Sequence, residues 1–359
     1  MVKHLKREIG GIEWTGRGIS IVDQGALPGL VKRIELCKAE EIVQAIRRLA
    51  IRGAPAIGAA GAYAVALAVK QATEERWGAR RLSDAMNEIG NCRPTAVNLS
   101  ICVQRAALKV PFGFAAVLNE AHAIVGEDRT ANRAMAEAGA DWLVSLFGDR
   151  KLRILTHCNT GHLATTGGGT ALGVIRALNY RHMIESVYVN ETRPLFQGSR
   201  LTSWELMNDG IPHQIQVDGA TAGTIVGGYV DVAIVGADRI AGNGDFANKI
   251  GTLGVALACD FARIPLIVAA STSTIDLDTF EGDCIEIEMR DPTEVTKWPN
   301  CDITPEGAIG HNPAFDVTPG RLVSAIVTEK GVLEVAAGQT PRGVGWGYTK
   351  SPTHPRGNL

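Results

Sequence analysis

The chain has 359 residues, which exceeds the usual size of a single domain, so two domains are expected. Its formal net charge of −2 gives no general attraction for nucleic acid or a membrane surface, and the expected partner is a small molecule or another subunit. The seven cysteines form no CxxC pair and no evident disulfide framework, which is typical of a reducing cytoplasm. The first residues lack the apolar segment of a secretory signal, and no apolar run is long enough to span a bilayer.

The first third of the chain predicts a small, mainly helical domain. Residues 12–36 alternate between apolar and polar residues and are broken by glycine and proline, as in a short antiparallel meander. Helical periodicity follows in segments 39–51, 56–69, 96–108, 115–124 and 130–146. A polar loop with a glycine is expected at residues 126–128. We therefore predict a domain boundary there, with a helical domain over residues 1–127 and a second domain over residues 128–359.

The second domain alternates short strand-like runs with helical segments. The runs lie at residues 153–156, 186–189, 214–217, 232–235 and 266–269, and the helical segments lie at 171–178, 199–208, 220–228 and 250–263. This alternation predicts the α/β class, with a Rossmann-like, doubly wound parallel sheet. The loose G-x-G-x-x-A pattern of Gly242, Gly244 and Ala247 lies too far beyond its strand for a dinucleotide-binding turn, and GxxxxGK[ST] is absent. No organic cofactor is predicted.

Two arginines stand before helix starts that contain proline. Arg52, Gly53 and Ala54 lead into a proline and an uncharged helical segment, and Arg93 stands before a second such start. Proline is favoured at the first helical position, and the free N–H groups of a helix start can form a cradle for phosphate or carboxylate with a nearby arginine. The alternative is structural, in which each arginine caps the carbonyl groups of a neighbouring helix.

Two chemically active side chains follow predicted strands. Cys158 comes just after the strand at 153–156, near a glycine-rich loop whose amides can stabilise a thiolate. Asp238 follows the strand at 232–235, and ligands of open parallel sheets bind outside the carboxyl ends of strands. The alternatives are an inert buried thiol and a turn aspartate that pairs with Arg239. A metal site built from His157, Cys158 and His162 would match no familiar ligand spacing, so no metal is predicted.

Further polar residues lie beside these strand ends. Gln197 belongs to a polar loop after the strand at 186–189, which suits hydroxyl and phosphate recognition or a subunit contact. Asn248 and Lys249 precede the helical segment 250–263, where a lysine and helix-start N–H groups would suit an anion. A doubly wound sheet could bring Cys158, Gln197 and Asp238 together across one crevice.

In this order the motifs resemble the methylthioribose-1-phosphate isomerase family. The wider superfamily includes ribose-1,5-bisphosphate isomerases and the regulatory subunits of translation initiation factor 2B, which share the fold but are not isomerases. The segments that carry the resemblance are RGAPAIG at 52–58, RPTAVNL at 93–99, THCNTG at 156–161, NETRP at 190–194, QGSR at 197–200, GADRI at 236–240 and NKIGT at 248–252.

The resemblance implies a methionine-salvage enzyme that converts 5-methylthioribose 1-phosphate into 5-methylthioribulose 1-phosphate. It also implies a homodimer, in which Asp238 acts as acid/base and Cys158 is its catalytic partner. The residues implied in substrate binding are Arg52, Gly53, Ala54, Arg93, Gln197, Asn248 and Lys249.

The chemistry explains the need for an acid and a thiol. The anomeric oxygen of the sugar carries phosphate, so the ring cannot open to a free aldehyde. Asp238, if burial keeps it protonated, could protonate the ring oxygen. The hydrogen at C2 then reaches C1 as a hydride, with Cys158 stabilising the cation, or through an enol phosphate, with the Cys158 thiolate removing the proton. The sequence leaves both routes open.

Two alternatives remain at this point. The chain could be a regulatory or nucleotide-sensing protein on the same fold, although the intact cysteine and aspartate motifs favour the enzyme. It could also use ribose 1,5-bisphosphate, since the number of basic residues does not exclude two phosphates. The overall motif match favours the methylthio sugar, with 5-deoxyribose 1-phosphate as a tolerated second substrate. The tail from Gly343 onward lies outside the motifs and is expected to be flexible.

Overall fold

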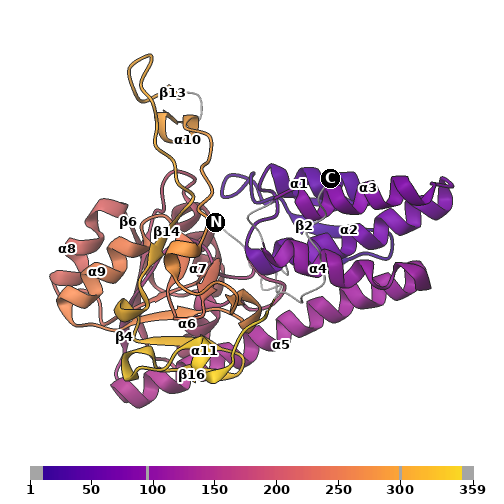
Figure 1. The fold of residues 1–359 in the computed structure, drawn as a ribbon. Helices are drawn as coiled ribbons and strands as arrows, with labels where there is room; N and C mark the ends of the chain where they lie inside the picture. The colour runs from indigo at the N-terminus through magenta and orange to yellow at the C-terminus, as the bar shows by residue number, and fades with distance from the viewer. Residues whose placement is uncertain (1–10, 94–96, 299–300, 350–359) are drawn as a thin grey trace.

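The computed structural model describes residues 11–93, 97–298 and 301–349 (Figure 1). A three-stranded antiparallel sheet of β1 (Ile12–Trp14), β2 (Ile19–Val22) and β3 (Arg33–Leu36) confirms the predicted meander. The helices that follow are α1 (Ala39–Arg47), α2 (Ala54–Glu74), α3 (Ala79–Asn91), α4 (Val97–Ala107) and α5 (Phe114–Phe147). The N-terminal part is therefore mainly helical, as expected.

Helix α2 is the centre of the helical part because it is buried along most of its length. Its residues 56–69 are small or apolar and carry no charge, so the helix can be covered on every side. Gly61 allows α4 to approach closely, since a Cβ at this position would lie 2.5 Å from Leu99 Cδ1. The start of α2 is fixed from outside, where the Ala56 N–H donates to the carbonyl of Ala164 at 3.2 Å.

Helix α5 runs without interruption over 34 residues, so the loop predicted at residues 126–128 is wrong. Gly126 and Glu127 are exposed. A short polar stretch occurs on an exposed helix face as readily as in a loop, so the sequence did not distinguish the two. The apolar contacts nevertheless change near this point. Val125 packs in the core of the helical part, whereas Met135 packs in a core of the large sheet. A domain boundary between residues 127 and 128 remains a proposal. It would divide α5 between the two domains (Figure 1).

The second part is built on a seven-stranded sheet in the order β16-β15-β10-β7-β4-β5-β6, whose neighbours pair in parallel except β15 and β16. The strands are β4 (Leu152–Thr156), β5 (Ile184–Asn190), β6 (His213–Gln216), β7 (Val232–Val235), β10 (Leu266–Ala269), β15 (Ala325–Thr328) and β16 (Gly331–Leu333). The covering helices are α6 (Ala171–Tyr180), α7 (Ser203–Asp209), α8 (Thr221–Val226) and α9 (Thr252–Ala262).

Alternate residues of the central strands face two separate cores, which confirms the doubly wound α/β class. On β7, Ile234 packs in the same core as residues of α5 and α6. Its neighbours Ala233 and Val235 pack with residues of α8 and α9 on the other face. Helices therefore cover both faces of the sheet, as the continuous apolar character of these strands requires.

A second sheet, in the order β11-β8-β9-β14, was not predicted. It consists of β11 (Ile275–Asp276), β8 (Arg239–Ala241), β9 (Phe246–Lys249) and β14 (Phe315–Thr318). Asn248 and Lys249 lie on β9, and α9 begins at Thr252 rather than at residue 250. The polar, glycine-rich sequence after Asp238 thus forms a hairpin of β8 and β9. Strand β14, from far along the chain, pairs with the other edge of β9.

Two C-terminal segments complete the molecule. An arm that contains α10 (Thr293–Thr296), β12 (Lys297–Trp298) and β13 (Cys301–Asp302) projects away from the rest (Figure 1). After α11 (Pro341–Val344), Tyr348 exchanges backbone hydrogen bonds of 2.9 Å with Ile275 and Leu277. The expectation of a flexible tail is therefore wrong up to residue 349, and the rest of the tail lies outside the described residues. Within the described ranges, no helix has the length and hydrophobicity of a membrane span.

Candidate active site

The predicted meeting of strand ends is present in the structure. Strand β4 lies between β7 and β5 in the sheet, so the loops that carry Asp238, Cys158 and Gln197 are neighbours. The order of the strands reverses at β4 and β7, which is where open α/β sheets bind ligands. All three side chains line a pocket of about 780 Å³, a volume that includes its open mouth. The other predicted site residues, Arg52, Gly53, Ala54, Arg93, Asn248 and Lys249, line the same pocket.

The start of α2 forms the N-terminal wall of the pocket. Gly53 has φ of 93°, and a Cβ there would lie 2.4 Å from the carbonyl oxygen of Ala164, so only glycine fits without strain. The Arg52 guanidinium is buried and donates to the backbone carbonyl of Asn159 at 3.2 and 3.3 Å, and also to its side-chain oxygen. Arg52 thus binds the loop that carries Cys158, rather than the end of a neighbouring helix.

Arg93 approaches from the same part of the chain. Its guanidinium lies 3.6 Å from the carboxylate of Glu288, and both side chains are largely buried. Residues 94–96, which include its predicted helix start, lie outside the described residues. Arg93 therefore contributes a positive charge to the pocket wall that is partly compensated by a carboxylate.

Cys158 is held in an unusual backbone conformation. Its φ of 65° lies in the left-handed region, which is uncommon for a residue with a Cβ. The Cys158 N–H donates to Thr192 Oγ1 at 2.9 Å, and Thr202 Oγ1 donates to its carbonyl at 2.5 Å. Burial raises the pKa of the thiol, although Arg52 and Lys249 act in the opposite direction. The raised pKa favours the protonated thiol, whereas the glycine-rich loop in the sequence suggested a stabilised thiolate.

Asp238 lines the same pocket as this thiol. Burial raises the pKa of its carboxyl group, and the cations of Lys249, Arg93 and Arg52 limit this rise. Its backbone N–H donates to the carbonyl of Ala247 at 2.9 Å, which fixes the start of the β8–β9 hairpin. Among the described residues it forms no ion pair with Arg239, so the alternative of a surface turn pair is not supported. A carboxyl group in this setting can hold a proton and donate it.

Lys249 and Asn248 line the pocket from β9. The Lys249 ammonium group lies 4.6 Å from the centre of the Phe315 ring, and burial lowers its pKa. The Asn248 side chain donates to Thr252 Oγ1 at 3.0 Å, which fixes its amide at the start of α9. The predicted setting beside a helix start therefore holds, although the residues themselves are in a strand.

Three buried polar atoms of the pocket have no hydrogen-bond partner among the described residues. They are Arg52 Nε, Thr160 Oγ1 and Gln197 Oε1. An unpaired buried polar group costs about 1–3 kcal/mol, so such groups are retained where a ligand pairs with them. Together with the arginines and Lys249 they suit a ligand that has both an anionic group and hydroxyl groups.

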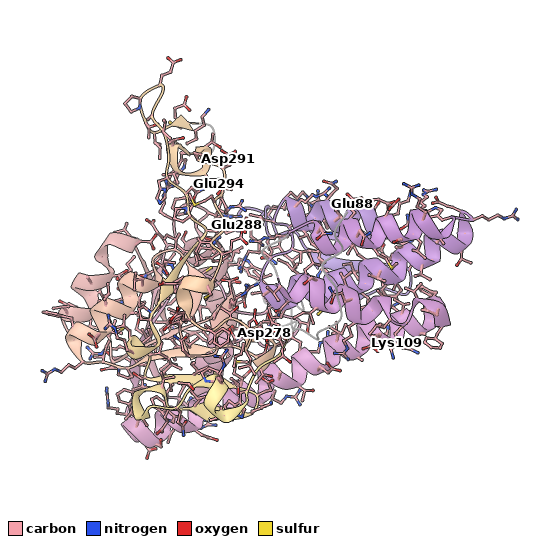
Figure 2. The ribbon with its side chains drawn as sticks, viewed as in Figure 1. Glu88, Lys109, Asp278, Glu288, Asp291 and Glu294 are labelled. Carbon is pink, nitrogen blue, oxygen red and sulfur yellow. The ribbon has the colours of Figure 1, made fainter. Side chains whose placement is uncertain are left out.

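The prediction missed several pocket residues, of which Arg290 is the most informative. Its guanidinium donates to Glu294 at 2.5 and 3.0 Å and to Glu288 at 3.2 Å, so its charge is compensated. Figure 2 shows Glu288 at the base of the arm, with Glu294 further along it. The alternating run IEIEM at 285–289 precedes this segment as a strand-like signal, but it does not show that the segment reaches the pocket, which depends on tertiary packing. The other missed residues include Leu49, Asn159, Thr160, Thr170, Leu195 and Phe315.

The histidines near Cys158 do not form a metal site. His157 Nε2 donates to the carbonyl of Ile250 at 2.8 Å, and its Nδ1 accepts from the Asn190 side chain at 3.1 Å. His162 Nδ1 donates to the carbonyl of Gly167 at 2.7 Å. No cluster of three or more potential ligands was found in the described part of the chain.

The fold and the pocket define an α/β protein with a pocket lined by arginine and lysine at the switch point of a parallel sheet. The chain belongs to the initiation factor 2 subunit family, whose model matches residues 50–335. It is 44% identical to the methylthioribose-1-phosphate isomerase of Desulforamulus reducens, over 90% of this chain and 94% of that protein. It is 45% identical to a probable bifunctional methylthioribose-1-phosphate isomerase/methylthioribulose-1-phosphate dehydratase of Nocardia farcinica, of whose length it spans 60%.

Two solved structures are similar over most of the chain. The 5-methylthioribose 1-phosphate isomerase of Pyrococcus horikoshii has a TM-score of 0.82 and 36% identity, and the match covers 90% of this chain and 92% of that one. The structure named translation initiation factor eIF-2B, subunit delta, from A. fulgidus has a TM-score of 0.80 and 38% identity, with coverage of 94% and 100%. Both names, an isomerase and a translation factor subunit, thus occur among the similar structures.

Proposed function

We propose that the protein is an aldose–ketose isomerase that converts 5-methylthioribose 1-phosphate into 5-methylthioribulose 1-phosphate in methionine salvage. The observation that carries the proposal is one pocket in which a proton-holding carboxyl group, Asp238, and a buried thiol, Cys158, face the cations of Arg52 and Lys249. The relatives named as isomerases support it, because they match nearly the whole chain.

In the proposed reaction Asp238 donates its proton to the ring oxygen, which opens the ring and leaves positive charge at C1. After hydrogen has moved from C2 to C1, the Asp238 carboxylate takes the proton of the C2 hydroxyl group, which gives the ketone and restores the acid. Burial raises the pKa of this carboxyl group, so the donor form is available nearer neutral pH than for an exposed aspartate. Arg52, Arg93 and Lys249 would bind the phosphate, while Gln197 and Asn248 would bind sugar hydroxyl groups. The unpaired atoms Arg52 Nε and Gln197 Oε1 would gain partners in the complex.

The transfer of hydrogen from C2 to C1 depends on the state of Cys158. A protonated thiol is a poor base, so the raised pKa favours transfer as a hydride, with the polarisable sulfur beside the cationic carbon. In the enol phosphate route, bound substrate would first have to promote loss of the thiol proton. Substrate deuterated at C2 distinguishes the routes, since hydride transfer keeps deuterium at C1 and the enol route exchanges it with water.

A second chamber of about 520 Å³ adjoins the pocket and suits the 5-methylthio group. It shares Gly53 and Asp238 with the pocket and adds the apolar side chains of Ile57, Val97 and Ile285. Its charged lining residues are Arg93 and Arg239 against Asp238 and Glu286, and the charge of Arg93 is partly compensated by Glu288, so it has little surplus positive charge for a second phosphate. A phosphate dianion in such a chamber would be strongly disfavoured.

The decisive experiment is turnover of three substrates by the purified protein, with the ketose followed by NMR. We expect kcat/KM for 5-methylthioribose 1-phosphate to exceed that for ribose 1,5-bisphosphate by at least about 100-fold, with 5-deoxyribose 1-phosphate in between. Equal or better use of the bisphosphate would assign the protein to the bisphosphate isomerases. Absence of ketose from all three substrates at any pH would favour a regulatory or nucleotide-sensing protein.

We also propose that the protein is a homodimer. Large exposed apolar side chains lie on or next to β6, α8 and α9, which are on the same side of the molecule in Figure 1, and we take them as one apolar face. Large exposed apolar areas on a water-soluble surface mark contact sites. The residues that form this face are Ile215, Val217, Val226, Tyr229, Leu257 and Phe261. A cytoplasmic location is proposed as well, because all seven cysteines are free thiols.

A further inference from the structure

Glu205, in the first turn of α7, is a buried carboxylate outside the predicted site. It is only 2% exposed, and its two oxygens accept four hydrogen bonds. The Asn159 side chain and the Leu163 N–H donate to one oxygen at 2.8 and 3.3 Å. The His162 N–H and Arg176 donate to the other, both at 2.8 Å. One carboxylate thus holds three successive parts of the loop that follows Cys158.

The charge of Glu205 is retained because Arg176 compensates it inside the protein. Arg176 also binds Asp209 at 2.7 Å and the carbonyl of Gly168 at 2.6 Å, so this guanidinium is itself fixed on three sides. Burial acts to raise the pKa of Glu205, but Arg176 and the hydrogen bonds outweigh it and leave the pKa below its usual value. An ionised carboxylate that is fully hydrogen-bonded is a rigid anchor.

The anchor is connected to the pocket through Asn159. The Asn159 amide group donates to Glu205, which orients its side-chain oxygen towards the guanidinium of Arg52. The same amide group lies 3.2 Å from Thr202 Oγ1, and Thr202 in turn donates to the carbonyl of Cys158. Gly161 is required for this arrangement, since a Cβ there would lie 2.0 Å from Glu205 Oε2.

We propose that Glu205 is a positioning residue, which sets the Asn159 side chain and thereby holds Arg52 in the geometry that binds the substrate phosphate. The proposal rests on the proposed function, because it takes Arg52 as a phosphate ligand. Within the described part of the chain, the hydrogen bonds of the Arg52 guanidinium go to Asn159, so Asn159 sets its orientation. Glu205 is the charged and nearer of the two acceptors that select the side-chain orientation of Asn159, since the other, Thr202 Oγ1, is neutral and lies at 3.2 Å.

The test is a double-mutant cycle of Glu205→Gln and Arg52→Lys, with kcat and KM measured for 5-methylthioribose 1-phosphate. Glutamine has one acceptor oxygen and places an NH₂ group against existing donors, so Asn159 loses its fixed orientation. We expect E205Q to lower kcat/KM by about 10- to 100-fold, mainly through KM. In the Arg52→Lys background, which lacks the guanidinium group, E205Q should lower kcat/KM by less than about threefold.

The matched control is Glu137→Gln, which removes a carboxylate that pairs with Arg181 at the surface and should leave kcat and KM unchanged. If E205Q does not fold, Asn159→Ser tests the same link in the same cycle, since it removes the side-chain connection but keeps the backbone carbonyl that Arg52 binds. Equal losses in the wild-type and Arg52→Lys backgrounds would overturn the positioning role.

Failure of the proposed function gives a different result, namely a wild-type protein without turnover. The positioning role is then decided by crystal structures of the wild type and E205Q. The proposal requires the Arg52 guanidinium to leave Asn159 in E205Q, and an unmoved guanidinium would overturn it.

Discussion

Cys158 and Asp238 show how one pocket can raise the pKa of two side chains with different chemical consequences. Burial raises the pKa of both groups. For the carboxyl group this makes a proton available for donation, whereas for the thiol it delays the formation of thiolate. The pocket therefore suits an acid at Asp238 and a polarisable neutral group at Cys158 in the resting state.

The first prediction concerns this pair. Cys158→Ala and Asp238→Asn should each lower kcat by about 10²- to 10⁴-fold, because each removes a group that acts on the reacting atoms. Substrate affinity, measured by calorimetry, should change little, since the phosphate ligands remain. The exposed thiol of Cys284 and the exposed carboxylate of Asp260 provide matched controls, C284A and D260N, which should keep full activity. Activity near that of the wild type in either site variant would remove that residue from the mechanism.

The second prediction concerns pH. If protonated Asp238 is the donor, kcat/KM falls as the pH rises through its pKa, which burial has raised. The Lys249 cation stabilises the carboxylate and lowers this pKa, so Lys249→Met should move the falling limb to higher pH. Glu288 acts in the opposite sense, so Glu288→Gln should move the limb to lower pH. If the falling limb stays at the wild-type pH in both variants, a group other than Asp238 titrates.

At the scale of elements, the site depends on where helices begin and continue. The start of α2 is fixed by a glycine that lies against the backbone of Ala164, and this places Arg52 beside the loop of Cys158. Helix α5 connects the two parts of the chain, and its exposed middle carries Gly126 in ordinary helical conformation.

The third prediction compares alanine at these two glycines. Gly53→Ala should lower the free energy of unfolding by about 1–3 kcal/mol and reduce kcat/KM, because its Cβ would lie 2.4 Å from a backbone oxygen and its φ is positive. Gly126→Ala meets no atom within 4 Å and should raise the free energy of unfolding by up to about 1 kcal/mol, through helix propensity alone. Urea unfolding measures both, and a destabilised G126A would contradict a continuous α5.

At the scale of the whole molecule, the open question is what covers the apolar face of β6, α8 and α9. Phe261 is 77% exposed and Leu257 is 50% exposed, although both are large apolar residues on α9. The opposite face of the same helix packs in the core of the large sheet through Val255 and Cys259. A second copy of the chain is the proposed cover.

The fourth prediction follows from this face. Sedimentation should find the wild type as a dimer, and the double change Leu257→Glu and Phe261→Glu should give a monomer that keeps its helical circular dichroism. Burying these side chains contributes about 1.5–3 kcal/mol each, and a buried carboxylate in their place is strongly disfavoured. The same change at exposed Leu108, on the helical part, is the control and should leave the dimer intact. A monomeric wild type, or a dimeric double variant, would reject this interface.

The sequence by itself determined much of this molecule. The strands β4, β5, β6, β7 and β10 were predictable because a short apolar run that ends at a turn is a local signal. Their parallel arrangement followed from the alternation with helices, and this placed Cys158, Gln197 and Asp238 at adjacent strand ends. The function rested on the order of the motifs, which the similar proteins support.

Tertiary structure alone decided the rest, because those features depend on contacts that no local pattern encodes. The Asn159 carbonyl and Arg52 lie 107 residues apart in sequence, and Glu205 joins them from a third segment. Phe315 reaches the pocket at the start of β14, which pairs with β9, and Arg290 is held beside the segment before β14, where its N–H donates to the carbonyl of Asn312. The continuity of α5 was hidden as well, since an exposed helix face and a polar loop have the same composition, and only packing on either side distinguishes them.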